Sequence, residues 1–467
     1  MFFFLANLPK RLGKKLFLEE DMKKIVVISV ILLLAVSFIA FAGGGRERDG
    51  RVQLTFSFWG VAAEEAITQQ ALDVFNNSQD RIRVTARAIP WEVYIETLNT
   101  MAAAGQLPDV GMMMESAVIP FADRGLLGDL GAMYAPGQPA PLSTLAFRNA
   151  RGQTVGYSVA NVMLVKYYNA DMFQRAGINA PKRMADSWNW DQFLAYARRL
   201  TLDNQGRNPG QPGFDRNNIV QYGAMIENLT WQLEVWTVSN GGGFVSPDGR
   251  EVWIDRPQSI EAIQRIADLH LVHNVAPFSP GLTDDGVQRS LLAGNVAMTT
   301  NGTWNIGTAL REPRDAGRLN YGVSVLPNMG RRLTMHTGGP VVMFSQTRHP
   351  AEVMEFIKWY SNPDNNFGLI EAGIWMPAFQ NWFTDSALLD RWARSPAYPP
   401  FDEFNSAVVQ TSLNYSQPVA NYYTGNQDVF IALLQSILGP VWTGQTTARE
   451  AITNNIDALR RAHATGQ

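Results

Sequence analysis

The stretch RVQLTFSFWGVAAEEAITQQALDVFNNSQDRIRVTARA, residues 51–88, decides the fold. Apolar and polar side chains alternate over residues 51–58, and this two-residue period predicts a half-buried strand. Apolar residues then recur at helical spacing over residues 67–75, and residues 81–88 again have the pattern of a strand. Strand, helix, strand is the unit from which parallel α/β sheets are built, so the fold class that we expect is α/β.

The same succession continues away from this stretch. Residues 93–104 are helical in pattern, and PDVGMMM, residues 108–114, predicts a third strand. The run at 154–168 is apolar, β-branched and too long for one short strand, so it is a candidate for a segment that passes between two lobes. Asn189, with Gln192 three residues later, forms a capping-box pattern that predicts the start of a helix.

Length and composition exclude several classes of protein. The chain has 467 residues, 46% of them apolar, which indicates two or more packed units. It has no Cys, and this rules out disulfides, thiolate metal sites and a Cys nucleophile. The formal charge is -3, and it becomes -6 when the first 42 residues, with six Lys or Arg and three Asp or Glu, are set aside. An acidic body of this kind does not favour nucleic acid as a partner.

The N-terminal region predicts export. Residues 1–21 do not fit a targeting signal, and we interpret them as a non-native extension that precedes the true start at Met22. Residues 22–42 have a basic start, an apolar run and small residues before Gly43, which is typical of a signal peptide cleaved after Ala42; the alternative is a retained membrane anchor. Residues 43–50 form a Gly-rich linker. We therefore expect a periplasmic or extracellular protein.

Eight segments, in this order, resemble the extracellular solute-binding proteins of bacterial ABC importers, in particular the sugar-binding, maltose-binding-protein-like type. They are FSFWG (56–60), GQLPDV (105–110), DRGLLGDL (123–130), YYNADMFQRAGI (167–178), AGNVAMTTNGTW (293–304), NYGVSVLPNMG (320–330), TGGPVVMFSQ (337–346) and GIWMPA (373–378). The resemblance implies a bilobal periplasmic-binding-protein fold of type II, in which hinge strands join two discontinuous α/β lobes. Lobe one would comprise 51–158 plus 333–376, and lobe two 159–332 plus 377–467. The passages between the lobes would lie near 158–163, 326–333 and 375–382.

The function that this resemblance implies is that of the substrate-binding subunit of an ABC sugar importer. Such a protein captures a carbohydrate in the cleft between its lobes and delivers it to the transmembrane permease subunits; we expect a monomer without cofactor, metal or catalytic residues. Two alternatives stay open, a sensory carbohydrate-binding protein that reports to a membrane receptor and a periplasmic carbohydrate-active hydrolase. The chain lacks the G-x-S-x-G, H-E-x-x-H and glycine-rich phosphate-loop motifs, and His270 and His273 have no Glu between them that would favour a metal site.

A sugar needs aromatic rings against its C–H faces and polar groups around its hydroxyls. Trp304, in the loop where sugar-binding relatives place a stacking aromatic, is our first candidate, against the alternative of a buried loop anchor. Trp59 ends the first predicted strand, where ligands of open α/β sheets collect, although such a Trp can also close a core. Trp231 is a candidate from a helix on which Trp236 must point elsewhere, since five residues turn a helix by roughly 140°. Trp375 lies in the Gly-flanked turn on the hinge side.

Polar candidates come from the same resemblance. Glu115 and Ser116 follow the third predicted strand, and Asn161 lies on the first passage between the lobes. Gly338 and Gly339 would let backbone amides approach the ligand. For Glu115 and Asn161 the alternative is a capping or turn residue. Maltose-type relatives carry a Trp and an Asp where this chain has Met113 and Ser116, which argues against maltose itself as the ligand.

Overall fold

The computed structural model describes residues 50–60, 62–134, 141–142, 146–149, 151–278 and 288–466. The predicted extension and signal peptide, and residues 43–49 of the linker, lie outside these ranges. Within them, no helix has the length and apolar character needed to cross a membrane.

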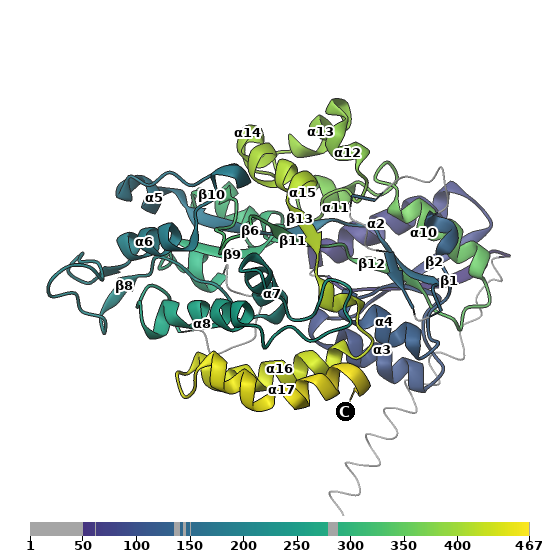
Figure 1. Cartoon of the computed structure of the whole chain (residues 1–467). Coiled ribbons are helices and arrows are strands. Elements are labelled where there is room, and N and C mark those ends of the chain that lie inside the picture. The colour runs from purple at the N-terminus through teal and green to yellow at the C-terminus, as the bar shows by residue number, and fades with distance from the viewer. Residues whose placement is uncertain are drawn as a thin grey trace, which may run out of the picture. The chain divides into compact units, whose positions relative to one another are not determined.

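Lobe one is built on a six-stranded sheet with the order β2-β1-β3-β12-β5-β4. The first three strands are parallel, and β12, which comes from much later in the chain, lies antiparallel between β3 and β5 (Figure 1). The strands of this sheet are β1 (Val52–Phe58), β2 (Ile82–Ala88), β3 (Val110–Met112), β4 (Ala146–Arg148), β5 (Thr154–Ser158) and β12 (Pro340–Met343). The helices that accompany them in the chain are α2 (Ala62–Ser78), α3 (Tyr94–Ala103), α4 (Glu115–Asp123), α10 (Pro350–Ser361) and α11 (Gly368–Glu371).

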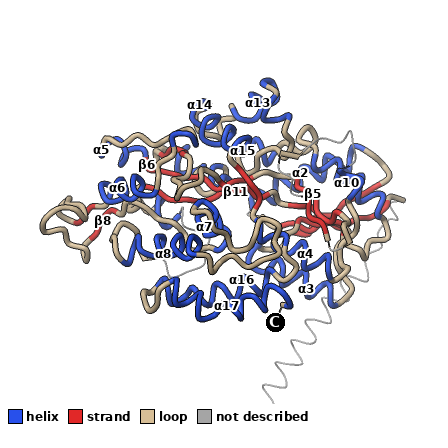
Figure 2. Tube along the Cα trace, viewed as in Figure 1, coloured by secondary structure: helices blue, strands red, loops and turns tan. Residues whose placement is uncertain are grey.

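Lobe two is built on a five-stranded sheet with the order β10-β6-β11-β13, to which β9 adds by pairing with β6. Its strands are β6 (Val162–Asn169), β9 (Met298–Gly302), β10 (Tyr321–Ser324), β11 (Thr334–Thr337) and β13 (Ser416–Pro418). A separate two-stranded ribbon consists of β7 (Leu202–Asp203) and β8 (Ile219–Gln221). Figure 2 shows the strands enclosed among helices and loops.

The remaining described helices all come after β6 in the chain. They are α5 (Ala170–Ala176), α6 (Trp190–Leu200), α7 (Thr230–Ser239), α8 (Pro257–Leu271), α9 (Arg311–Asp315), α12 (Asn381–Thr384), α13 (Ser386–Ala393), α14 (Phe401–Phe404), α15 (Gln410–Asn414), α16 (Gln427–Trp442) and α17 (Ala448–Thr465). Seven short 3₁₀ or π segments complete the described elements: Trp91–Val93, Gly131–Tyr134, Met184–Asp186, Gln288–Leu292, Thr303–Ile306, Asn405–Val409 and Ala420–Tyr423.

Three chain segments meet where one sheet gives way to the other. The chain leaves β5 for β6 through Val159–Asn161 and returns from β11 to β12 through Gly338–Gly339. The N–H of Ala160 donates to the carbonyl of Gly338 at 3.3 Å, and Asn161 and Met376 exchange two backbone hydrogen bonds of 3.0 Å. The passages therefore run side by side as a hydrogen-bonded group, which we call the crossing segments: Val159–Asn161, Gly338–Gly339 and Trp375–Met376.

The return passage lies later in the chain than residues 326–333, where we expected it. β11 falls inside the range that we predicted for lobe one, but it pairs with β6 and β13 in the five-stranded sheet. The local pattern did not indicate this, because β11 is a short strand whose partners lie far away in the sequence.

Candidate ligand-binding site

Trp231 and Trp304 form an aromatic pair on lobe two. Trp304 lies in the short 3₁₀ helix that follows β9, and Trp231 lies in the first turn of α7. Their ring centroids are 5.6 Å apart and their planes are inclined by 46°. Both side chains are half-buried, so each keeps apolar surface that a ligand is able to cover.

The Trp304 ring lies over the backbone of Gly302. A Cβ at position 302 would come within 1.9 Å of Cζ3 of the ring, far inside van der Waals contact. Only glycine therefore permits this position of the ring. The Gly302 carbonyl is itself held by the hydroxyl of Tyr167, which donates to it at 2.9 Å.

A buried polar network joins the elements that carry the two tryptophans. The Glu227 carboxylate, whose residue is 3% exposed, accepts from the side-chain amides of Gln232 at 2.6 Å and Asn301 at 3.1 Å. Gln232 in turn accepts from the Thr300 hydroxyl at 3.0 Å, and Asn301 accepts from the amide of Asn305 at 3.1 Å. Such a network ties α7 to β9 and to the loop after it, which fixes the geometry of the pair.

The two tryptophans of α7 point in different directions, as their spacing predicts. Trp236 is fully buried, and its ring meets that of Trp190 edge to face with centroids 5.9 Å apart. It belongs to the core of lobe two, and Trp231 alone of the two approaches Trp304.

Glu115, Gly338 and Gly339 come together in the structure, but they bond to one another. Oε1 of Glu115 accepts from the N–H of Gly338 at 2.9 Å, from the N–H of Gly339 at 3.1 Å and from the Thr337 hydroxyl. Gly339 has φ +43°, a left-handed conformation that favours glycine. The carboxylate thus attaches the start of α4 to the second crossing segment. Ser116, the next residue of α4, is half-buried.

Tyr422, in the 3₁₀ helix Ala420–Tyr423, is buried near the carboxylates of Glu115 and Glu234. Burial raises the pKa of its hydroxyl well above the usual range, and the nearby carboxylates of Glu115 and Glu234 raise it further. Glu234 lies on α7, where its Oε1 accepts from the N–H of Ala420 at 3.1 Å. The N-terminus of α4 and the body of α7 therefore approach one tyrosine from different lobes.

Asn161 and Trp375 lie on neighbouring crossing segments. Asn161 is 3% exposed, and neither Oδ1 nor Nδ2 of its side chain has a partner among the described residues. A buried amide in this state has both donors and an acceptor to offer. Trp375 is half-buried, and its ring meets that of Tyr360 edge to face at 6.5 Å between centroids.

Trp59 belongs to an aromatic cluster at the end of β1. Its ring contacts those of Trp91 and Tyr94 edge to face, with centroids 5.1 and 5.0 Å apart. Tyr94 is held in place because its hydroxyl donates to the carbonyl of Met112 at 2.7 Å. Trp91 is 48% exposed, so this cluster presents an accessible ring on lobe one.

The family model for bacterial extracellular solute-binding proteins matches residues 60–367, well over half of the chain. The chain belongs to the bacterial extracellular solute-binding protein family. A binding protein of Brucella abortus is 23% identical over 338 residues, which cover 71% of this chain and 77% of that protein.

Solved structures show that this solute-binding protein has a type II periplasmic-binding-protein fold. An ABC substrate-binding protein of Listeria monocytogenes in complex with cycloalternan is similar with a TM-score of 0.71 at 20% identity, over 88% of this chain and 98% of the other. The GacH receptor of Streptomyces glaucescens, solved unliganded and with acarbose, is similar with a TM-score of 0.70 at 18% identity, over 89% and 99% of the two chains.

Several side chains of this solute-binding protein were missing from our sequence candidates. Trp91 carried a signal that could have been used, since it follows the second strand just as Trp59 follows the first. Tyr422, Glu234 and the Glu227 network carried none, because their significance depends on burial and on distant partners. Across the part of the chain that the structure describes, no group of three or more His, Cys, Asp or Glu side chains is placed to hold a metal ion.

Proposed function

We propose that this solute-binding protein is the substrate-binding subunit of an ABC importer and that its ligand is a carbohydrate. The observation that carries the proposal is the half-exposed pair of Trp231 and Trp304, fixed from behind by a buried polar network. Two proteins of similar fold, named above, were solved with the oligosaccharides cycloalternan and acarbose. In this proposal the protein binds its ligand without converting it.

The chemistry of the site matches what a sugar requires. The inclined indole rings offer two apolar surfaces against which C–H faces of adjacent sugar rings pack. The unpartnered amide of Asn161 is able both to accept from and to donate to hydroxyl groups. On lobe one, the ring of Trp91, supported by Trp59, would supply a further apolar contact.

Closure of the lobes would follow from shared contact. A ligand shifts an equilibrium between open and closed forms only by the difference in its affinity for them, so it must touch both lobes when they close. The crossing segments would act as the hinge, because they are the hydrogen-bonded strands that pass between the sheets. The closed form would then be presented to the transmembrane permease, outside the cytoplasmic membrane to which residues 22–42 would have directed the chain.

The test is a thermal-shift screen of mono- and oligosaccharides, followed by calorimetric titration of the best ligand. We expect Trp304→Ala to weaken binding by more than about tenfold, or about 1.4 kcal/mol, with thermal unfolding almost unchanged. The matched control is Trp253→Ala, which removes a half-buried Trp that contacts Arg256 outside the site and should leave affinity unaltered. Equal affinity in both variants would remove Trp304 from the site, and formation of sugar products would indicate a hydrolase.

A further inference from the structure

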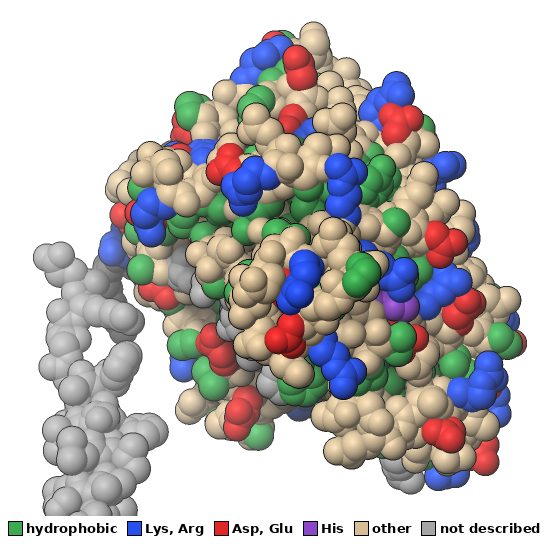
Figure 3. Space-filling model, turned by 90° about the vertical axis from the view of Figure 1, so that its left-hand side faces the viewer, with side chains coloured by type: hydrophobic (Ala, Val, Ile, Leu, Met, Phe, Trp, Pro, Cys, Tyr) green, Lys and Arg blue, Asp and Glu red, His purple; other side chains and the backbone are tan. Residues whose placement is uncertain are grey.

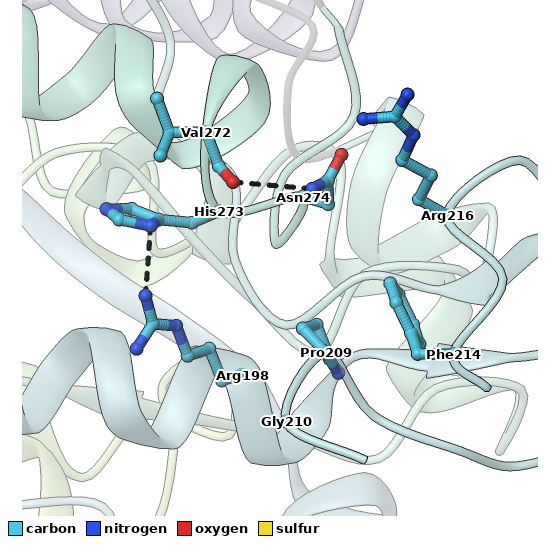
Figure 4. A pocket seen from close by; sticks show the side chains of 8 residues that line it. All are labelled: Arg198, Pro209, Gly210, Phe214, Arg216, Val272, His273 and Asn274. Atoms are coloured by element: carbon cyan, nitrogen blue, oxygen red, sulfur yellow. Dashed lines mark hydrogen bonds between the residues drawn. The ribbon is translucent and has the colours of Figure 1, made fainter. Parts of the chain in front are cut away.

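A pocket of about 240 Å³ lies in lobe two, and none of the residues that line it belongs to the candidate carbohydrate site. Arg198 of α6 lines it on one side, and the loop between β7 and β8 contributes Pro209, Phe214 and Arg216. His273 and the neighbouring loop after α8 complete the wall. In Figure 4 the guanidinium of Arg198 points to His273, while that of Arg216 lies on the other side of the pocket. Pro209 and Phe214 lie side by side below them.

None of the described residues that line this pocket is an acid. Nη2 of Arg198 lies 3.0 Å from Nδ1 of His273, and because a guanidinium only donates, the imidazole accepts and is neutral. Burial, together with the charge of Arg198, lowers the pKa of His273, although the carboxylate of Asp268 acts in the opposite direction. Among the described residues no carboxylate pairs with Arg198 or Arg216, and none lines the pocket. Figure 3 shows Lys and Arg side chains near a His on the face at the β8 end, with Asp and Glu side chains among them.

The loop that carries Arg216 and Phe214 is fixed in advance by a buried aspartate. The Asp203 side chain accepts from the N–H groups of Gln205 at 2.8 Å, Arg207 at 2.9 Å and Asp215 at 3.0 Å, and from Nε of Arg207 at 2.9 Å. Burial alone would raise the pKa of Asp203, but these donors hold it well below its usual range. The nearest acid in sequence, Asp215, accepts from Asn218 at 2.7 Å and does not turn to Arg216.

Pro209, Phe214 and Val272 give the pocket an apolar part beside the polar Asn274. The Phe214 ring and Pro209 lie side by side in Figure 4, on the loop that also carries Arg216. Two arginines without an acidic partner among the described residues, together with the Phe214 ring, complement a doubly charged anion that carries a compact apolar group. A phosphate monoester has a charge of about -1.5 to -2 at pH 7 and three acceptor oxygens, whereas a carboxylate supplies a single charge.

We propose that this pocket binds a small phosphate monoester, with its phosphoryl oxygens on Arg198 and Arg216 and its organic group against Phe214 and Pro209. The assignment does not depend on the carbohydrate site, since the two share no residue. It predicts that phosphate esters bind whether or not the protein binds sugars.

The experiment titrates the full chain with phenyl phosphate, inorganic phosphate, benzoate and phenol by calorimetry at a constant ionic strength of about 0.1 M. We expect phenyl phosphate to bind at one site, more tightly than inorganic phosphate or benzoate, and phenol not to bind. Arg198→Gln and Arg216→Gln should each weaken phenyl phosphate binding by about fivefold or more, since each removes one charge-assisted contact. Phe214→Ala should reduce the affinity for phenyl phosphate to that for inorganic phosphate.

The matched control is Arg199→Gln, which makes the same change of charge on the same helix at a residue that does not line the pocket. It should bind phenyl phosphate as the wild type does. A wild type that shows no saturable binding would overturn the proposal, and so would a loss in Arg199→Gln equal to that in Arg198→Gln, which would indicate nonspecific attraction. Benzoate binding as tight as that of phenyl phosphate would refute the assignment to a phosphate ester.

Discussion

The position of Trp304 depends on the absence of a single methyl group at residue 302. The indole ring occupies the volume in which any other side chain at position 302 would begin. Residue 302 also ends β9 and pairs with Leu164 of β6, so the strand cannot easily move away to make room. Gly302 therefore acts as a positioning residue for the proposed site, because it leaves room for the Trp304 ring.

We predict that Gly302→Ala displaces the Trp304 ring and weakens carbohydrate binding about as much as Trp304→Ala does. Fluorine NMR of protein labelled with 5-fluorotryptophan, with the Trp304 resonance assigned from Trp304→Phe, would show that resonance shifted in the variant. The control is Gly439→Ala in α16, where an added Cβ meets nothing within 4 Å. An unshifted resonance in Gly302→Ala would show that the ring does not depend on this glycine.

Glu115, a candidate ligand-binding residue, also holds the framework together. Its carboxylate accepts three hydrogen bonds from residues 337–339, so those amides are occupied within the protein. We predict that Glu115→Ala lowers the free energy of unfolding by about 1–3 kcal/mol, because it leaves buried donors without an acceptor. Urea unfolding measures this, with exposed Glu92→Ala as control. A stability equal to that of the control would show that the contact contributes little.

At the scale of the element, local periodicity was a good guide where neighbours in sequence determine the structure. The alternation over 51–58 corresponds to β1, the helical spacing after it to α2, and the run at 154–168 to β5 and β6. Both hydrogen bonds of the predicted capping box, between Asn189 and Gln192, are formed. Each of these features depends on residues within one helical turn or one strand, so the local sequence pattern is enough to predict it.

Pairing between distant segments was harder to infer. Nothing local indicates that β12 enters between β3 and β5, or that β13 extends the sheet of lobe two beside β11. In the candidate site, too, some residues could be predicted from the sequence and others could not. Large aromatic residues such as Trp304 and Trp231 are visible in the sequence, whereas the Glu227 network and Tyr422 depend on which segments the fold brings together.

At the scale of the whole molecule, a buried histidine near the crossing segments couples stability to pH. His336 lies on β11, is 3% exposed, and neither ring nitrogen has a partner among the described residues. Burial lowers its pKa to about 4. The folded form therefore holds the neutral ring, while the unfolded chain takes up a proton below its ordinary pKa of about 6.5.

We predict that the free energy of unfolding falls as the pH drops from about 6.5 to about 4, with His336 contributing up to about 1.4 kcal/mol per pH unit. The contribution is complete above pH 6.5, because there the unfolded chain is neutral at this residue too. His336→Leu should flatten the dependence in that window and leave the slope above pH 7 as in the wild type. Urea unfolding at a series of pH values measures both, and parallel curves throughout would refute the role of His336.

The account as a whole holds that one carbohydrate contacts both lobes and that closure results from this shared contact. Small-angle X-ray scattering of the protein with and without its best saccharide measures that closure directly. We predict a smaller radius of gyration at saturation in the wild type and no change in Trp304→Ala at the same sugar concentration. A saturated wild type whose radius of gyration stays the same would contradict the account.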